Sequence, residues 1–89
     1  MTTSTAAEIR ATIVRALRRI APEADIDTLD PDLSVREQLD IDSMDFLNFA
    51  IALHKEFGVA IPEADYPALL TLNGAVAYIQ HAPAATAGS

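Results

Sequence analysis

Apolar residues recur at three- and four-residue intervals near the start of the chain, which places them on one face of a helix. The residues that keep this spacing are Ile9, Ile13, Leu17 and Ile20, with Val14 beside them. The stretch Thr5-Ala6-Ala7-Glu8 forms a capping box before them, and Pro22 stops a helix after them. We therefore expect a core-facing helix that begins at Thr5 and ends before Pro22.

Two further helical patterns follow in the second half of the chain. One runs over 43–57 and meets Gly58, which suits the left-handed residue after a helix. The other begins after Thr71, with Leu72, Val76 and Ile79 facing inward. Between them, 59–62 is a brief extended link, and 63–69 is a short helix that Pro67 makes irregular.

The connection over 21–42 is long for a compact bundle, so we expect it to carry anchors of its own. Its apolar residues are Leu33, Val35, Leu39 and Ile41. Ser34-x-x-Glu37 is a second capping box, which predicts a short helical turn pinned to the core by these residues. The predicted fold class is an all-α four-helix bundle of three main helices and one short helix. Residues 1–81 form one domain, and 82–89 form a disordered tail.

The helix over 43–57 has more apolar surface than one core-facing stripe requires, because its apolar arc spans roughly 200°. The residues expected in the core are Phe46, Phe49, Ala50, Leu53 and Phe57, and those expected to face water are Asp45, Asn48, Lys55 and Glu56. A second strip consists of Met44, Leu47 and Ile51, accompanied by His54. Two arrangements are open: the bundle surrounds this helix, or the strip is exposed and contacts a partner. Burying an unpaired imidazole costs free energy, so His54 favours the exposed strip.

Composition and charge narrow the functional classes. The chain has 89 residues, 51% hydrophobic, and no cysteine, which excludes disulfides, thiolate metal sites and a cysteine nucleophile. The net charge is −7, and residues 21–45 hold nine acids against one base, Arg36. The negative charge of this stretch repels the phosphates of nucleic acid and attracts basic protein surfaces. No apolar run reaches membrane-spanning length. The Arg- and Ala-rich opening also suits a transit peptide, but its apolar spacing favours a core helix.

Ser43 stands where the acidic run meets the helix over 43–57. Asp42 is a good N-cap, so the serine hydroxyl is not needed for capping and points outward at a helix end that favours negative groups. A hydrolase needs a base near the serine, but His54 is about 16 Å along the same helix. With no base near the serine, the chain is not expected to be an enzyme. Residues 25–36 contain several aspartates, but they lack the glycine and the glutamate that an EF-hand calcium loop requires.

The stretch "LDIDSMDFLNFAIALHKEFGVAIPEADYPALLTLNGAVAYI" resembles an acyl carrier protein, and the four-helix layout extends the resemblance over about residues 5–81. In that family the serine of an Asp-Ser-Leu/Met motif is esterified by 4′-phosphopantetheine from coenzyme A. The resemblance implies attachment at Ser43, flanked by the recognition positions Asp42 and Met44. It also implies that partner enzymes read the positions listed here: Asp45, Leu47, Asn48, Ile51 and His54.

The resemblance implies a cytoplasmic, monomeric carrier that a phosphopantetheinyl transferase loads. Acyl-transferring or synthase enzymes of fatty-acid, polyketide or related biosynthesis would then use it. Two departures stand out: Asp40 occupies a frequent glycine position, and Asn48, His54 and Lys55 stand at positions of the second helix where the family usually has glutamates. We therefore expect a dedicated partner set. The alternative is a non-catalytic acidic adaptor that binds a partner through the Met44–Leu47–Ile51 strip; composition and periodicity alone leave the two comparable.

Overall fold

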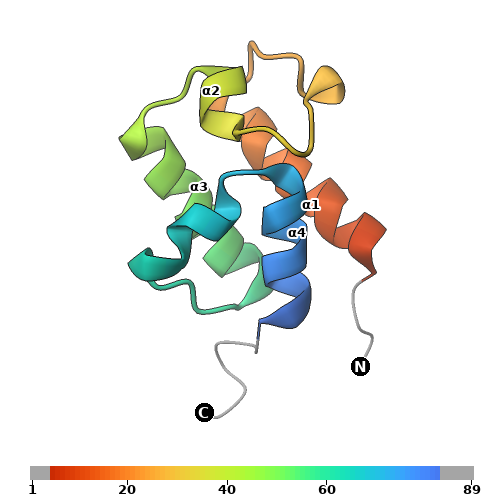
Figure 1. The fold of residues 1–89 in the computed structure, drawn as a ribbon, viewed down its shortest axis with the longest axis vertical. Coiled ribbons are helices and arrows are strands. Elements are labelled where there is room, and N and C mark those ends of the chain that lie inside the picture. The colour runs from red at the N-terminus through yellow and green to blue at the C-terminus, as the bar shows by residue number, and fades with distance from the viewer. Residues whose placement is uncertain (1–4, 83–89) are drawn as a thin grey trace.

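The computed structural model describes residues 5–82 of the chain as a bundle of helices (Figure 1). The elements in order are α1 (Ala6–Ile20), η1 (Ile26–Thr28), α2 (Val35–Leu39), α3 (Ser43–Phe57), η2 (Glu63–Leu69) and α4 (Leu72–His81). The long helix α1 packs against both α3 and α4, and the short 3-10 helix η2 packs against α4. This arrangement confirms the all-α bundle with three main helices.

Side-chain caps fix the beginnings of the main helices where the sequence predicts them. Thr5 and Glu8 make both bonds of a capping box before α1. Thr71 caps α4 by accepting a hydrogen bond of 2.9 Å from the Gly74 N–H. Helix α3 ends at Gly58, whose φ of 64° is left-handed and whose N–H donates to the His54 carbonyl. These local signals explain why the predicted bounds of α1 and α3 and the predicted start of α4 agree with the structure to within one residue.

The core lies between α1, α3 and α4. The most deeply buried large side chains are Ile13, Leu17, Val35, Phe49, Leu53, Leu69 and Leu72. Phe46 and Ala50 are also buried, as predicted, whereas Phe57 and Val76 are only half-buried and pack against the core from its edge. Each of the main helices therefore contributes a stripe of the kind that its spacing predicts.

The connection between α1 and α3 is tied by hydrogen bonds to the start of α4 and to the residues just before it. The Val35 N–H donates to the Leu70 carbonyl at 2.7 Å, and Ser34 pairs with Thr71 in an isolated bridge. The Asn73 N–H donates to the Pro31 carbonyl, and the Asn73 amide donates to Asp32. These bonds place α2 over the first turn of α4 and beside the start of α3 (Figure 1).

Two expectations for this connection were wrong or incomplete. Leu33 was expected to anchor it, but the side chain is 56% exposed, whereas Val35 and Ile41 are buried and Leu39 packs on the core edge. The Leu33 carbonyl accepts a bond from the Gln38 side chain, which also makes two bonds to the Asp30 backbone. Polar contacts therefore fix this turn in place of the leucine. The single turn η1, with Ile26 buried, was not predicted.

Residues 1–4 and 83–89 lie outside the described part of the chain, and so does nearly all of the predicted tail over 82–89. The boundary between domain and tail stays a prediction. Among residues 5–82, no helix is both long enough and apolar enough to cross a membrane.

Candidate functional site

The start of α3 leaves the Ser43 hydroxyl without a capping role. The Asp42 carboxylate accepts a hydrogen bond of 2.9 Å from the Asp45 N–H, which caps the helix. Ser43 is the first residue of α3 and is exposed, as are Asp42 and Met44 on either side. Phe46, one turn further along, is buried and anchors this turn to the core. The structure thus presents a serine oxygen to solvent from a rigid position.

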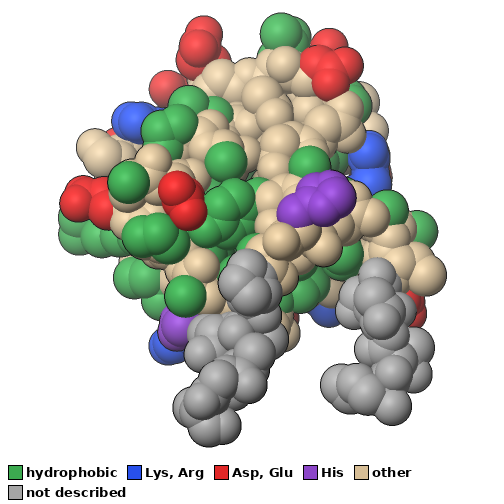
Figure 2. Space-filling model, turned by 60° about the horizontal axis from the view of Figure 1, so that its bottom comes forward, with side chains coloured by type: hydrophobic (Ala, Val, Ile, Leu, Met, Phe, Trp, Pro, Cys, Tyr) green, Lys and Arg blue, Asp and Glu red, His purple; other side chains and the backbone are tan. Residues whose placement is uncertain are grey.

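The second apolar strip of α3 is exposed, as predicted. Met44 is 67% exposed, Leu47 36% and Ile51 41%, and together with Leu33 these are the large exposed hydrophobic residues of the described chain. Figure 2 shows hydrophobic side chains gathered on the side that carries α3 and η2, at the left of the view, with acidic side chains around them. A strip of this kind next to the serine suits contact with another protein.

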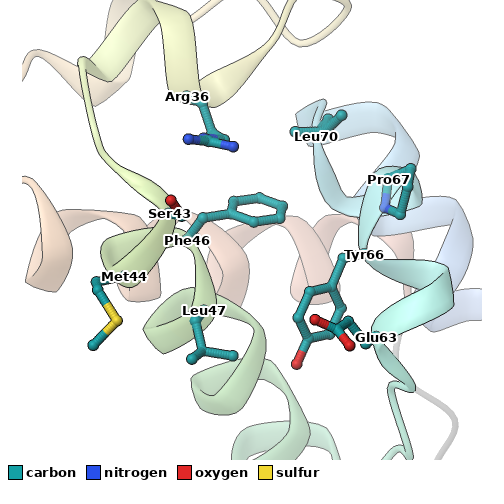
Figure 3. Close-up of a pocket in the computed structure, with 9 residues that line it drawn as sticks. All are labelled: Arg36, Ser43, Met44, Phe46, Leu47, Glu63, Tyr66, Pro67 and Leu70. Carbon is teal, nitrogen blue, oxygen red and sulfur yellow. The ribbon is translucent and has the colours of Figure 1, made fainter.

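An open hollow of about 470 Å³ lies beside Ser43, between α2, α3 and η2 (Figure 3). The residues that line it are Arg36, Ser43, Met44, Phe46, Leu47, Glu63, Tyr66, Pro67 and Leu70. Phe46 forms its floor and meets the Tyr66 ring edge-on, with 6.3 Å between ring centroids. Most of these side chains are apolar, so the hollow offers an apolar surface that begins at Ser43.

A second hollow, of about 490 Å³, continues along the same side of α3 and shares Tyr66 with the first. Its lining residues are Ala50, Ile51, His54, Ala60, Ile61, Pro62 and Tyr66. His54 is exposed, but its Nδ1 lies 2.8 Å from the Val59 carbonyl oxygen. The imidazole is therefore paired with the backbone. The strip is exposed as expected, but the cost of burying an unpaired imidazole was not a sound reason for expecting it.

Asp45 and Asn48 lie apart from this apolar side. Asn48 is exposed, and neither residue lines either of the two hollows along α3. Asp45 is half-buried, although it was expected to face water, and it lines a separate hollow with Asp40, Ile41 and the end of α1. The structure therefore brings together Ser43, Met44 and Leu47 in one hollow, and Ile51 and His54 in the next.

Sequence reasoning placed only Ser43, Met44 and Leu47 at this hollow, and the polar residues that it missed include Arg36, Glu63 and Tyr66. The Arg36 guanidinium carbon lies 5.8 Å from the centroid of the Phe46 ring, in a cation–π arrangement. A signal for Arg36 was available, because it is the single base among nine acids in residues 21–45. Glu63 and Tyr66 come from the short irregular helix η2, where no periodic pattern marks one face.

The model of a family described as "Phosphopantetheine attachment site" matches residues 7–79 of this chain. The chain belongs to the acyl carrier protein family. A curated relative, the acyl carrier protein of Renibacterium salmoninarum, is 36% identical over 74 residues, which cover 83% of this chain and 86% of that protein. The cofactor of this family is 4′-phosphopantetheine, and it is therefore the cofactor of this carrier.

Two further relatives of the carrier match over shorter stretches. The acyl carrier protein AcpXL of Mesorhizobium japonicum is 48% identical over 40 residues, which is 45% of this chain and 43% of that protein. The meromycolate extension acyl carrier protein of Mycolicibacterium aurum is 40% identical over 50 residues, 56% of this chain and 52% of that protein. These matches are local and cover about half of each relative.

The described residues fit the cofactor. The Ser43 oxygen is exposed and is not needed as a cap, and the hollow next to it is apolar and open. No buried polar side-chain atom among residues 5–82 lacks a hydrogen-bond partner, so the core of the carrier is complete as it stands. Ser43 and the open, apolar hollow beside it are therefore compatible with a covalently attached arm.

Proposed function

We propose that this carrier holds its 4′-phosphopantetheine arm on Ser43 and delivers acyl groups to enzymes of fatty-acid, polyketide or related biosynthesis. The observation that carries this proposal is the exposed Ser43 hydroxyl at the start of α3, which Asp42 leaves free by capping the helix itself. When bound, the arm supplies a terminal thiol on which acyl groups are held as thioesters. The names of the relatives support an acyl cargo.

The chain's own residues have two tasks in this function. The first turn of α3 holds the attachment point in place, because Asp42 caps it and Phe46 fixes it to the core. The exposed strip of Met44, Leu47 and Ile51 provides an apolar surface on which partner enzymes dock beside the arm. His54 lines the same hollow as Ile51, and Asn48 is exposed on the same helix but lines neither hollow along α3. Reading of Asp45 by partners stays a prediction from the family resemblance.

The adaptor alternative shares the strip but needs no chemistry at Ser43. Family membership favours the carrier, because the matched family is defined by phosphopantetheine attachment. We further propose that the carrier is monomeric and cytoplasmic and is not itself an enzyme. Its partners would be a phosphopantetheinyl transferase together with synthases and acyl-transferring enzymes.

A thiol assay tests the proposal, because the chain has no cysteine. The protein is incubated with coenzyme A and a broad-specificity phosphopantetheinyl transferase, freed of small molecules and treated with a thiol-specific dye. We expect about one dye per chain after loading and none before it. A chain that stays unlabelled, while a known carrier in the same reaction is labelled, would contradict the carrier proposal and favour the adaptor.

A further inference from the structure

The surroundings of Ser43 carry an excess of negative charge. Asp42 precedes it and Asp45 follows two residues later, and Glu63 faces the same hollow from η2. A phosphodiester on Ser43 would add one more negative charge at this place, and like charges this close repel one another. Among the described residues that line the hollow, Arg36 is the one cation. Its position relative to Ser43 therefore matters.

Arg36 faces the hollow from α2 and has no ion-pair partner among residues 5–82. Its guanidinium lies over the face of Phe46, on the side where Ser43 projects (Figure 3). Within residues 5–82, the only ion pair is between Arg18 and Asp27, and no hydrogen bond is donated by the Arg36 side chain. Contact with a ring face uses none of the N–H donors, so the donors stay available to an anion.

The backbone of Arg36 is held firmly although α2 has only five residues. The Val35 N–H bond to Leu70 and the Ser34–Thr71 bridge tie the start of α2 to the segment before α4. Val35 itself is buried in the core. The side chain is half-buried against Phe46, which restricts its rotamers before any ligand arrives. A guanidinium held in this way binds an anion at a smaller entropic cost than a free surface arginine.

We propose that Arg36 is the phosphate-binding residue of this carrier and that its guanidinium pairs with the phosphodiester that joins the arm to Ser43. This inference rests on the proposed attachment at Ser43. A planar guanidinium matches two phosphate oxygens in a bidentate contact, which a lysine ammonium does not reproduce. The contact offsets the repulsion from Asp42, Asp45 and Glu63. It also directs the first part of the arm over Phe46, toward the Tyr66 end of the hollow.

Phosphorus NMR of the loaded protein tests this pairing through the phosphate itself. The variants are Arg36→Met, which keeps an apolar stem on Phe46, Arg36→Lys, which keeps the charge, and Arg10→Met, which removes an equal charge from the exposed face of α1. Intact mass first shows that each variant is loaded. Failure of the parent to load would refute attachment itself. This outcome is distinct from a loaded protein whose phosphorus resonance does not depend on Arg36.

For the folded parent, we expect the phosphorus resonance to be displaced from its position in urea, and the displacement to shrink as salt is added. Arg36→Met should lose most of the displacement, Arg36→Lys should keep part of it, and Arg10→Met should keep all of it. The Arg36 Nε–H signal of the parent should also move on loading. An unchanged resonance in Arg36→Met, or an equal loss in Arg10→Met, would overturn the proposal.

Discussion

The Tyr78 hydroxyl of α4 donates a hydrogen bond of 2.7 Å to the Asp65 carboxylate of η2. The same hydroxyl lies 3.4 Å from the Ala60 carbonyl oxygen, so one side chain contacts both the link after α3 and the helix η2 that follows it. Tyr66, one residue after Asp65, meets Phe46 across the hollow beside Ser43. The Tyr78–Asp65 bond therefore fixes the wall of the hollow opposite α3.

Replacing Tyr78 with Phe should lower the free energy of unfolding by about 1 kcal/mol, because it removes one partly buried hydrogen bond. Burial first, and then the bond to Asp65 and its charge, raise the pKa of Tyr78 from 10.0 to about 12. The raised pKa means that the folded state keeps the proton more strongly than the unfolded state does. This contribution to stability is fully present below about pH 10 and is lost as the pH rises toward 12.

Urea unfolding between pH 9 and 12, together with tyrosinate absorbance, measures this effect. The absorbance step at the highest pH should disappear in Tyr78→Phe and persist in Tyr66→Phe. Over this pH range, the unfolding free energy of Tyr78→Phe should also fall less than that of the parent. A parent and a Tyr78→Phe variant with the same pH profile would contradict the assignment.

Asp40 has a left-handed backbone, with φ of 54° and ψ of 44°, at the end of α2. Family members often have glycine at this position, and glycine adopts this conformation without the steric cost that a Cβ brings. We expect Asp40→Gly to raise the unfolding free energy by about 0.5–1 kcal/mol. Asp25→Gly removes the same charge where φ is −87°, and should give no such gain. Chemical unfolding compares the two; an Asp40→Gly variant less stable than the parent would refute the strain.

Local signals predicted much of the fold because several of its helices carry complete caps. Asp42 and Gly58 define both ends of α3, and Thr71 defines the start of α4. The same logic failed at Leu33, because hydrophobicity says nothing about which way a residue points in a non-helical turn. There the bond from the Asn73 N–H to the Pro31 carbonyl and the bond from the Val35 N–H to the Leu70 carbonyl hold the backbone, and these long-range contacts leave no mark in the local pattern.

The candidate site was predicted in part for the same reason. Helical periodicity placed Met44, Leu47 and Ile51 on one exposed strip, because all three lie on one regular helix. It could not place Arg36 or Tyr66 beside Ser43, since they come from other elements and reach the hollow through tertiary packing. The bond between His54 and the Val59 carbonyl likewise depends on how the chain turns at Gly58.

Phe49→Ala and Leu53→Ala should each cost about 2–5 kcal/mol of unfolding free energy, because both side chains are fully buried between the main helices. This is a large part of the stability of a small domain. Asn48→Ala, on the exposed side of the same helix, serves as the control and should change stability by less than about 0.5 kcal/mol. Urea unfolding gives the values. Core variants that melt like the parent would show that the faces of α3 are assigned wrongly.

Leu47→Glu and Ile51→Glu should impair docking rather than folding, because both side chains are partly exposed on the strip. We expect kcat/KM for loading by a phosphopantetheinyl transferase to fall about tenfold, which corresponds to ~1.4 kcal/mol. Ala77→Glu adds the same charge on an exposed position of α4 and should leave loading unchanged. A large fall in Tm for the α3 variants, or an equal fall in loading for Ala77→Glu, would count against a docking role.

The site of attachment is tested most directly by fragmenting the loaded protein in a mass spectrometer. We expect one phosphopantetheine per chain, on the fragment that contains Ser43, and none in Ser43→Ala. Ser34→Ala, which removes the hydroxyl that caps α2, should still be loaded. A phosphopantetheine found on any other residue, or an undiminished mass gain in Ser43→Ala, would contradict the central claim.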